Sequence, residues 1–434
     1  MPPRHAGVHP NCAWIAYTCA MNTASAAGVV IVGAGQAGGD LCGALRAQGY
    51  KGPITLIGDE PYAPYRRPPL SKAFLSGEAT LESLYLKSAE AYARQQIDCR
   101  FGIGVERIER KAGSVRLYDG RVLPYQHLVL ATGGRARRLS LPGANHPNVH
   151  YIRNIEDILK LKEQLLPGKR LLIVGGGYVG LEAACVGIKK GLDVTLIESL
   201  DRVLARVTAP ELSAFYEKAH RARGVHIVTG TGLHALQGDA LVDAVVLSDG
   251  RRLDADLVIV GIGMIPNTEL ADAAQLKVQN GIVVDAFTRT EDPAIYAIGD
   301  CCNHENVFLG RRLRLESVPN AAEQARVCAA AICGKPQPYG AVPWFWSDQY
   351  DLKLQMVGLS EGYDELVIRG DPDKECFSAF YLRTGILIAA DAVNRPQEFI
   401  VAKRMVTDRA QLTAAQLRDE GTPLKMLAGQ PKPA

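Results

Sequence analysis

Two glycine-rich stretches have the spacing of a phosphate-binding turn. They are VVIVGAGQAGGD, with Gly33, Gly35 and Gly38, and LLIVGGGYVGLE, with Gly175, Gly177 and Gly180. In a GxGxxG turn the first glycine allows the tight bend from strand to helix, the second lets the backbone approach a pyrophosphate, and the third lets helix and strand pack closely. The helix that follows presents free N–H groups to an anion. The sequence therefore predicts two dinucleotide-binding sites.

An acidic residue near the end of the second strand of each unit is suited to a ribose. Asp59 follows ITLIG, and Glu198 follows VTLI. A carboxylate in this position accepts hydrogen bonds from the ribose hydroxyls. In the second unit it also repels a 2′-phosphate, which favours NADH over NADPH. The nearby Arg202, taken as a further nucleotide contact, would weaken that preference.

The same elements recur around both motifs, which indicates a duplicated unit. Each fingerprint follows a β-branched run and opens an Ala/Leu-rich helical pattern, and a later strand appears in both, HLVLATGG and DLVIVGIG. We therefore predict an α/β fold with two Rossmann-like dinucleotide-binding domains. The residues that end the later strands are predicted to border the cofactors: Ala131, Thr132 and Gly133 in the first unit, Gly261 and Gly263 in the second.

Composition and charge exclude several other classes. The net charge of +3 is too small to predict binding to nucleic acid or to an anionic membrane. No apolar run approaches the ~18 residues that span a bilayer. The ten cysteines are scattered without a CxxC pair, which favours reduced thiols and a cytoplasmic location. Cys301, Cys302 and His304 are close in sequence but lack the four spaced ligands of a structural metal site, so no metal is predicted.

The first 27 residues are predicted to form an extension that is disordered. Residues 12–20, CAWIAYTCA, weakly imitate a signal peptide, but Tyr17 and Thr18 interrupt the apolar run. Translation that starts at Met21 is the other interpretation.

Five further motifs resemble those of a known family. They are PYRRPPLSK, the GLE after the second fingerprint, TEDPAIYAIGD, RLESVPNAAEQAR and PWFWSDQY. Together they resemble the bacterial FAD- and NADH-dependent ferredoxin reductases that serve cytochrome P450 or ring-hydroxylating dioxygenase systems. The resemblance implies an NADH:ferredoxin oxidoreductase of glutathione-reductase-like architecture. Such an enzyme passes hydride from NADH to FAD and then single electrons to a 2Fe–2S ferredoxin.

The motif TEDPAIYAIGD resembles a flavin signature, which implies that Asp300 bonds the ribityl chain of FAD from late in the sequence. The FAD-binding domain is then discontinuous. The predicted domains are 28–145 with 266–335 for FAD, 146–265 for NAD, and 336–434 for a C-terminal α+β domain. In the last of these, LKLQMVG, DELVIRG, FSAFYL and GILIAADAV are predicted strands.

The resemblance also implies a catalytic ion pair. Lys72 would lie beside the flavin ring and pair with Glu182, and its charge would stabilise the anion that forms when the flavin accepts hydride. Ser71, which follows Pro68 and Pro69, is predicted to cap the helix that begins there. A lysine that is simply solvated at a helix end is the alternative for Lys72.

Other contacts follow from the same resemblance. Arg67 would lie over the FAD, Val318 and Trp346 would border the flavin, and Glu316 would contact the nicotinamide. Trp346 lies either on the route to the ferredoxin or in a purely structural contact. An acidic ferredoxin would need local basic residues on the reductase. The candidates are Arg311, Arg312, Arg314, Lys403 and Arg404.

Two rival functions stay open. A disulfide or peroxide reductase needs a reactive cysteine beside the flavin, but the chain has none between Cys42 and Cys99. A redox-gated interaction protein similar to apoptosis-inducing factor is the second rival, disfavoured by the missing basic surface and targeting segment. We expect a monomer or weak homodimer.

Overall fold

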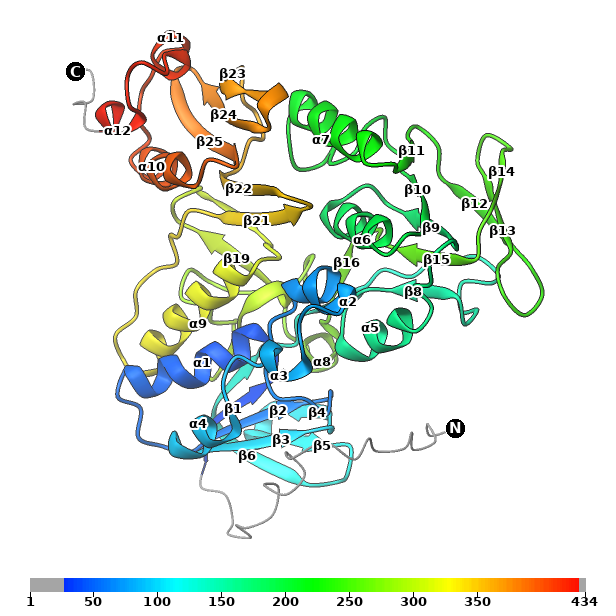
Figure 1. Cartoon of the computed structure of the whole chain (residues 1–434). Coiled ribbons are helices and arrows are strands. Elements are labelled where there is room, and N and C mark those ends of the chain that lie inside the picture. The colour runs from blue at the N-terminus through cyan, green and yellow to red at the C-terminus, as the bar shows by residue number, and fades with distance from the viewer. Residues whose placement is uncertain (1–26, 429–434) are drawn as a thin grey trace.

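The computed structural model describes residues 27–428, which form three units around a common centre (Figure 1). The predicted N-terminal extension lies outside the described residues, apart from Ala27. Among residues 27–428, no helix has both the length and the apolar character that crossing a membrane requires.

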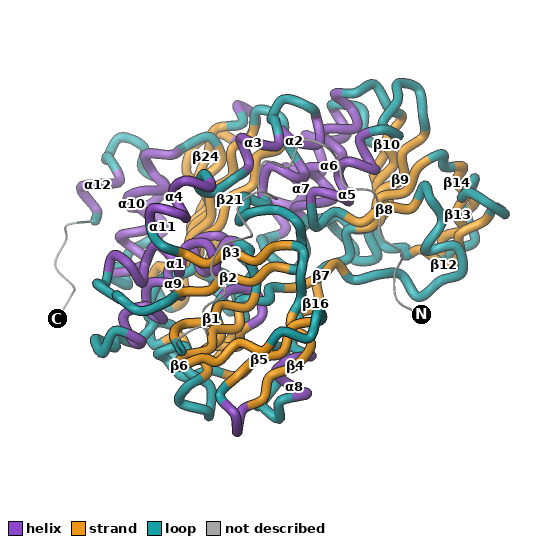
Figure 2. The backbone as a smooth tube through the Cα atoms, turned by 90° about the horizontal axis from the view of Figure 1, so that it is seen from below, coloured by secondary structure: helices purple, strands orange, loops and turns teal. Residues whose placement is uncertain are grey.

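The first unit is built on a mostly parallel sheet around β1 (Gly28–Val32). The strand order is β3-β2-β1-β6-β5-β4, and β18 pairs with β6 (Figure 2). The other strands are β2 (Ile54–Gly58), β3 (Ile97–Phe101), β4 (Val105–Glu109), β5 (Ser114–Leu117), β6 (Val122–Leu130) and β18 (Ile295–Ala297). Because β18 runs parallel to β6, the segment just before Asp300 lies in the same sheet as the first glycine fingerprint.

Both faces of this sheet are buried, and successive side chains of β1 point to opposite faces. Val29 and Ile31 pack on the side covered by α1 (Gln36–Ala47) and α9 (Val318–Ile332), whereas Val30 and Val32 face the opposite cluster. Short helices complete the unit: α2 (Ala73–Ser76), α3 (Leu81–Leu84), α4 (Ala89–Arg94) and α8 (Glu269–Ala273).

The second unit repeats the parallel arrangement with the order β11-β10-β9-β15-β8. Its strands are β8 (Val149–Tyr151), β9 (Arg170–Val174), β10 (Asp193–Ile197), β11 (His226–Val228) and β15 (Leu257–Val260). Its helices are α5 (Ile155–Lys162), α6 (Tyr178–Lys189) and α7 (Pro210–Ala222). An antiparallel sheet of β12 (Leu233–Gln237), β13 (Ala244–Leu247) and β14 (Arg252–Asp254) extends it, and β7 (Gly134–Ala136) pairs with β16 (Met264–Pro266) where the chain passes between the units.

The third unit is an antiparallel sheet in the order β21-β22-β25-β24-β23. Its strands are β21 (Trp344–Gln349), β22 (Leu352–Gly358), β23 (Glu365–Asp371), β24 (Cys376–Arg383) and β25 (Ile386–Val393), and the four predicted strands are the last four of these. The helices are α10 (Pro396–Thr407), α11 (Ala414–Arg418) and α12 (Leu424–Leu427). A small sheet of β17 (Ile282–Val283), β19 (Cys302–Asn306) and β20 (Arg311–Leu313) precedes this unit in the chain. The predicted fold class is confirmed.

The third sheet is covered on both faces. One face packs on α10 through Phe380 and Phe399. The other packs on the second unit, where the rings of Phe215 and Phe377 meet edge to face at 4.9 Å. The apolar side chains buried between the second and third units hold these two units together as a single body.

A buried carboxylate also lies in the interface between the second and third units. Asp391 Oδ2 accepts hydrogen bonds from Tyr381 Oη at 2.5 Å and from Thr208 Oγ1 at 2.9 Å. Both donors are neutral, so burial dominates and raises the pKa of Asp391 to about 6.

An Asp391→Asn variant should gain stability relative to the wild type as the pH rises from about 4 to about 7. The raised pKa means that the folded state binds the Asp391 proton more tightly than the unfolded state does. The cost of the buried charge is therefore absent below the ordinary pKa and complete above the raised one. The expected change is about 3 kcal/mol, measured by urea unfolding at each pH. Parallel stability curves for the two proteins would contradict it.

Candidate cofactor and active site

The two glycine fingerprints have the same internal geometry. A Cβ on Gly33 would lie 2.1 Å from Ala131 O, and one on Gly175 would lie 2.4 Å from Gly261 O. The third glycine of each motif is equally tight, because a Cβ on Gly180 would lie 2.0 Å from Gly175 O. Gly33 and Gly175 also have φ of 114° and 111°, which favours glycine. The predicted strand-to-helix turns are therefore present in both units.

The middle glycines differ from the others, since nothing lies within 4 Å of a Cβ placed on Gly35 or Gly177. These two residues precede α1 and α6, and neither helix has a side-chain cap at its start. Each turn thus leaves open space beside uncapped N–H groups, which suits a pyrophosphate. The residues present fit two bound dinucleotides, as the sequence predicts.

The acidic residues of the two units occupy different positions. Glu198 Oε2 accepts a hydrogen bond from Gly176 N at 2.7 Å. Gly33 N bonds Ile57 O and Gly175 N bonds Ile197 O, so the structural equivalent of Glu198 is Gly58. Asp59 lies one residue further along, and its carboxylate accepts from Glu60 N. Contacts of both acids with a ribose stay predictions.

Arg202 is engaged in its own loop. Its guanidinium donates to the hydroxyl of Ser213 and to the carbonyl oxygens of Ala205 and Thr208. These bonds brace the segment between β10 and α7. A role for Arg202 in nucleotide binding stays a prediction, and it would require some of these donors to be released.

The predicted loop residues lie where the two units join. Asn267 donates from its backbone N–H to Gly133 O at 2.9 Å, and Thr132 Oγ1 donates to Asn267 O at 2.6 Å. In the second unit Gly261 N bonds Val174 O, and Gly263 has a φ of 101°. These loops therefore lie at the ends of the central strands, beside the glycine turns.

A cluster of arginines and acids surrounds Asp300. Arg153 Nη2 lies 3.3 Å from Asp300 Oδ2, and its backbone oxygen accepts from Arg67 Nη1 at 2.7 Å. Arg67 also forms an ion pair with Glu60 at 2.6 Å. Arg67 is therefore held between the first and second units. Arg153 was not predicted, because the sequence RNIED around it has no motif.

The structure shows the ion pair that the resemblance implies. Lys72 Nζ lies 2.9 Å from Glu182 Oε1, with 18% of the lysine side chain and 5% of the glutamate side chain exposed. Lys72 comes from the segment before α2, and Glu182 from α6. The alternative of a simply solvated lysine is therefore wrong. The roles of both residues beside a flavin stay predictions.

Two serine hydroxyls complete the carboxylate's surroundings. Ser71 Oγ donates to Glu182 Oε2 and Ser347 Oγ donates to Glu182 Oε1, both at 2.6 Å. The prediction that Ser71 caps a helix is wrong, because a 3₁₀ turn over residues 68–71 precedes Lys72 and the hydroxyl turns to Glu182 instead. Each of the three units thus supplies a partner to this site, since Ser347 lies on β21. The site is where Figure 1 shows α2, α6 and β21 converging.

Burial raises the pKa of Glu182 above its ordinary value, while Lys72 and the hydroxyls of Ser347 and Ser71 oppose the rise. The competition matters because an uncompensated charge at this depth is costly. Lys72 and the two hydroxyls are therefore the groups that favour the ionised form of Glu182.

Three predicted cofactor contacts, Glu316, Val318 and Trp346, come from the last third of the chain. Val318 begins α9, and Glu316 accepts a hydrogen bond from Arg314 Nη1 at 2.6 Å. Trp346 is half-buried, with its ring 5.7 Å from that of Trp344. Their contacts with flavin and nicotinamide stay predictions.

The cysteines among residues 27–428 are all free thiols. Cys42 on α1 is buried in the first unit, and burial raises its pKa, so the thiol stays protonated and unreactive. No group of three or more His, Cys, Asp or Glu side chains suited to a metal occurs within the same residues.

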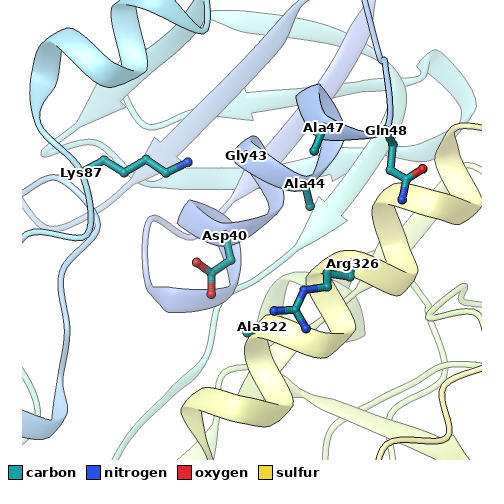
Figure 3. A pocket seen from close by; sticks show the side chains of 8 residues that line it. All are labelled: Asp40, Gly43, Ala44, Ala47, Gln48, Lys87, Ala322 and Arg326. Carbon is teal, nitrogen blue, oxygen red and sulfur yellow. The ribbon is translucent and has the colours of Figure 1, made fainter.

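A separate cavity of about 340 Å³ lies between α1 and α9 (Figure 3). Asp40 and Lys87 border it on one side and Arg326 on the other. No residue of the predicted cofactor site lines it.

The comparisons with known proteins agree with this geometry. Residues 27–325, more than half of the chain, match the pyridine nucleotide-disulphide oxidoreductase family, and residues 344–428 match the reductase C-terminal family. The chain belongs to the pyridine nucleotide-disulphide oxidoreductase family. This pyridine nucleotide-disulphide oxidoreductase uses FAD and NAD(H), as its family implies. The two open glycine turns are the places that fit them.

Relatives of this oxidoreductase span nearly its whole length. Putidaredoxin reductase from Pseudomonas putida is 49% identical over 410 residues, covering 93% of this chain and 97% of the relative. Rhodocoxin reductase from Rhodococcus erythropolis is 42% identical over 405 residues, covering 93% and 95%. Among solved structures, the covalent putidaredoxin reductase–putidaredoxin complex matches with a TM-score of 0.90 at 49% identity and covers 93% of this chain and 98% of that chain. The names of these relatives identify them as reductases of putidaredoxin and of rhodocoxin.

Proposed function

We propose that this chain is an FAD-dependent NADH:ferredoxin oxidoreductase that supplies electrons, through a 2Fe–2S ferredoxin, to a cytochrome P450 or dioxygenase. The observation that carries the proposal is the Lys72–Glu182 pair, held by hydroxyls from the first and third units next to two open dinucleotide turns. The buried, protonated thiol of Cys42 argues against the disulfide and peroxide reductase rival.

The residues act mainly by position and charge. FAD, when bound, accepts a hydride and releases electrons one at a time. The turn at Gly35 would hold its pyrophosphate, and Asp300 its ribityl chain. The turn at Gly177 would hold NADH, with Glu198 on the ribose. Lys72 would place a positive charge where negative charge develops, and Glu182 would fix the direction of the lysine side chain.

The preference for NADH rests on Glu198. Its carboxylate is held at the glycine turn by Gly176 N, so it would lie close to a 2′-phosphate and repel it. Free thiols among the described residues favour a reducing, cytoplasmic location. We propose a monomer or weak homodimer as the working form.

Helix α10 is the best of the predicted basic docking sites. Arg311 pairs with Glu361, Arg312 donates to backbone oxygens, and Arg314 pairs with Glu316. Those three arginines are therefore engaged with other segments, whereas among the described residues Arg404 pairs only with Asp408 at the end of its own helix, at 3.5 Å. On α10, Ile400, Lys403 and Arg404 have the spacing that places them on one side of a helix.

The side chains of this α10 face suit an acidic partner. Ile400 is 69% exposed and the Arg404 side chain 73% exposed. Lys403 Nζ lies 4.8 Å from the ring centre of Trp344, next to Trp346. An exposed apolar residue with adjacent cations is a fitting surface for an acidic ferredoxin.

A Lys403→Gln/Arg404→Gln double variant should raise the KM for ferredoxin about 10-fold at low salt and leave kcat nearly unchanged. Loss of two rim charges slows encounter more than it alters the chemistry, so the difference should shrink in high salt. Ferredoxin titrations at two ionic strengths measure it. Lys111→Gln, on the exposed turn between β4 and β5, is the matched control and should behave as the wild type. Equal KM values for all three proteins would indicate that the ferredoxin docks on another surface.

The function itself is tested by NADH oxidation with cytochrome c as the final acceptor, with and without a 2Fe–2S ferredoxin. A rate that depends on ferredoxin, with little reduction of DTNB or peroxide, is expected. Rapid reduction of DTNB or peroxide, with no effect of ferredoxin, would overturn the proposal in favour of the rival reductase.

A further inference from the structure

A continuous line of hydrogen bonds leads from Glu182 into the interface between the second and third units. Ser347 Oγ donates to Glu182 Oε1 at 2.6 Å, and Gln349 Nε2 donates to Ser347 Oγ at 3.2 Å. Beyond them, His220 Nε2 lies 2.9 Å from Gln349 Oε1, and Tyr350 Oη lies 3.4 Å from His220 Nδ1. We call these four residues, Ser347, Gln349, His220 and Tyr350, the Glu182 chain.

The protons of the Glu182 chain all point toward the carboxylate. The single hydroxyl proton of Ser347 goes to Glu182, so Ser347 accepts from the amide of Gln349. Gln349 Oε1 only accepts, so His220 must carry a proton on Nε2. Burial lowers the pKa of His220 to about 4. The ring is therefore neutral near pH 7, and its Nδ1 accepts from Tyr350.

The inner links are shielded from water. Ser347, Gln349 and His220 are 0% exposed, and Glu182 is 4% exposed. In such surroundings aligned hydrogen bonds strengthen one another by about 10–30% per bond. The hydroxyl of Ser347 is consequently a better donor to Glu182 with the chain behind it than it would be alone.

We propose that His220 and Gln349 are positioning residues that favour the ionised form of Glu182 and so influence the net charge beside Lys72. The inference rests on the proposed function only for the place of FAD next to Lys72. His220 lies on α7, which holds none of the predicted site residues. Through His220 this helix would influence the reduction potential of the bound FAD.

Other charged or titratable groups face the chain, and the Tyr350 hydroxyl also interacts with the thiol of Cys185. Lys72 faces Glu182 from the segment before α2, and Tyr178 and Cys185 face it from α6. Burial raises the pKa of Tyr178 well above its ordinary value and that of Cys185 to about 12, so both stay protonated. Arg223 faces His220 and Tyr350 and stays charged.

The experiment compares four variants of the FAD-loaded protein. His220→Leu and Gln349→Leu break the chain. His220→Gln keeps a donor toward Gln349. Tyr381→Phe removes a different buried hydrogen bond, to Asp391, in the same interface. The reduction potential of the bound FAD is measured from pH 5 to pH 9 by equilibration with dyes. The inflection that is absent from a Glu182→Gln reference protein is assigned to Glu182.

Both leucine variants should move the inflection up by about 0.5–1 pH unit, because a weaker donor chain makes Glu182 easier to protonate. His220→Gln and Tyr381→Phe should keep the wild-type inflection. The proposal is overturned if the leucine variants leave the inflection in place. It is also overturned if Tyr381→Phe moves it equally, since that would indicate a loosened interface or the titration of Asp391.

A measurement on the wild type does not depend on the folding of any variant. Nitrogen-15 NMR of histidine-labelled protein should show His220 as the neutral Nε2–H tautomer from pH 5 to pH 8. An Nδ1–H tautomer would reverse the chain and refute the proposal. Neither readout uses ferredoxin. A protein that failed to reduce ferredoxin while the inflection still moved would contradict the proposed function and leave this inference standing.

Discussion

A Gly177→Val variant should keep its FAD and lose most of its affinity for NADH, with a KM at least about 100-fold higher. The φ of Gly177 is −81°, which valine adopts without strain, and no atom lies within 4 Å of an added Cβ. The new side chain would meet only the bound nucleotide. Loss of two hydrogen bonds to a charged pyrophosphate, at roughly 1.5–3 kcal/mol each, corresponds to that factor or more.

The matched control is the same change in the other unit. Gly35 also has a negative φ, −88°, and open space around its Cβ position. Gly35→Val should therefore yield a folded protein that lacks FAD. FAD content from absorbance and KM from initial rates measure the pair. If Gly177→Val lost FAD while Gly35→Val kept it, the assignment of the two sites would be reversed. Gly180 is unsuited to the test, because its Cβ would collide with Gly175 O.

A Lys72→Met variant should slow the reduction of its bound flavin by NADH about 100-fold. Removal of one preorganised charge or donor from the place where charge develops costs about that factor. The measurement is anaerobic stopped-flow bleaching of the flavin at saturating NADH. Lys189→Met removes a lysine from the exposed surface of the same region, where it pairs with Glu78, and should have no effect.

Loss of Lys72 also leaves Glu182 buried without its cation, which destabilises the fold by itself. A Lys72→Met/Glu182→Gln double variant removes both charges and separates the two effects. Its stability should return toward the wild type while the flavin is still reduced slowly. A double variant that regained the wild-type rate would assign Lys72 a purely structural role.

The glycine turns and the later strands were predictable because their signals are local. Gly33 and Gly175 are required by positive φ, and the third glycine of each motif is required by its contact with the carbonyl oxygen of the first. Such local requirements fix residue type at a set spacing. The central strands of the third unit are apolar runs because both faces of that sheet are covered. The ion pair of Lys72 with Glu182 was implied by family resemblance and is present.

The partners that the sequence did not predict belong to contacts between distant segments. Ser347 lies 165 residues from Glu182, and Arg153 lies 147 from Asp300. A serine in a strand or an arginine before a helix has many ordinary uses, so neither carries a local signal. The three arginines at 311, 312 and 314 looked available in sequence, but each meets an acid or a carbonyl oxygen from a more distant segment, which for Arg314 is Asp300 O.

Alternate residues of β21 face opposite sides of the third sheet, and the two sides have different tasks. Ser347 and Gln349 point toward Glu182 and His220, whereas Trp344 and Trp346 belong to the opposite face, with Trp344 5.9 Å from Phe399 of α10. Under the proposed docking at α10, changes at Trp344 would alter partner choice without reaching Glu182. Exchange of the whole C-terminal unit between homologues would affect the surroundings of Glu182, because the incoming unit must also supply Ser347 and Gln349. Chimeras that lack the glutamine should therefore show the same raised inflection as Gln349→Leu.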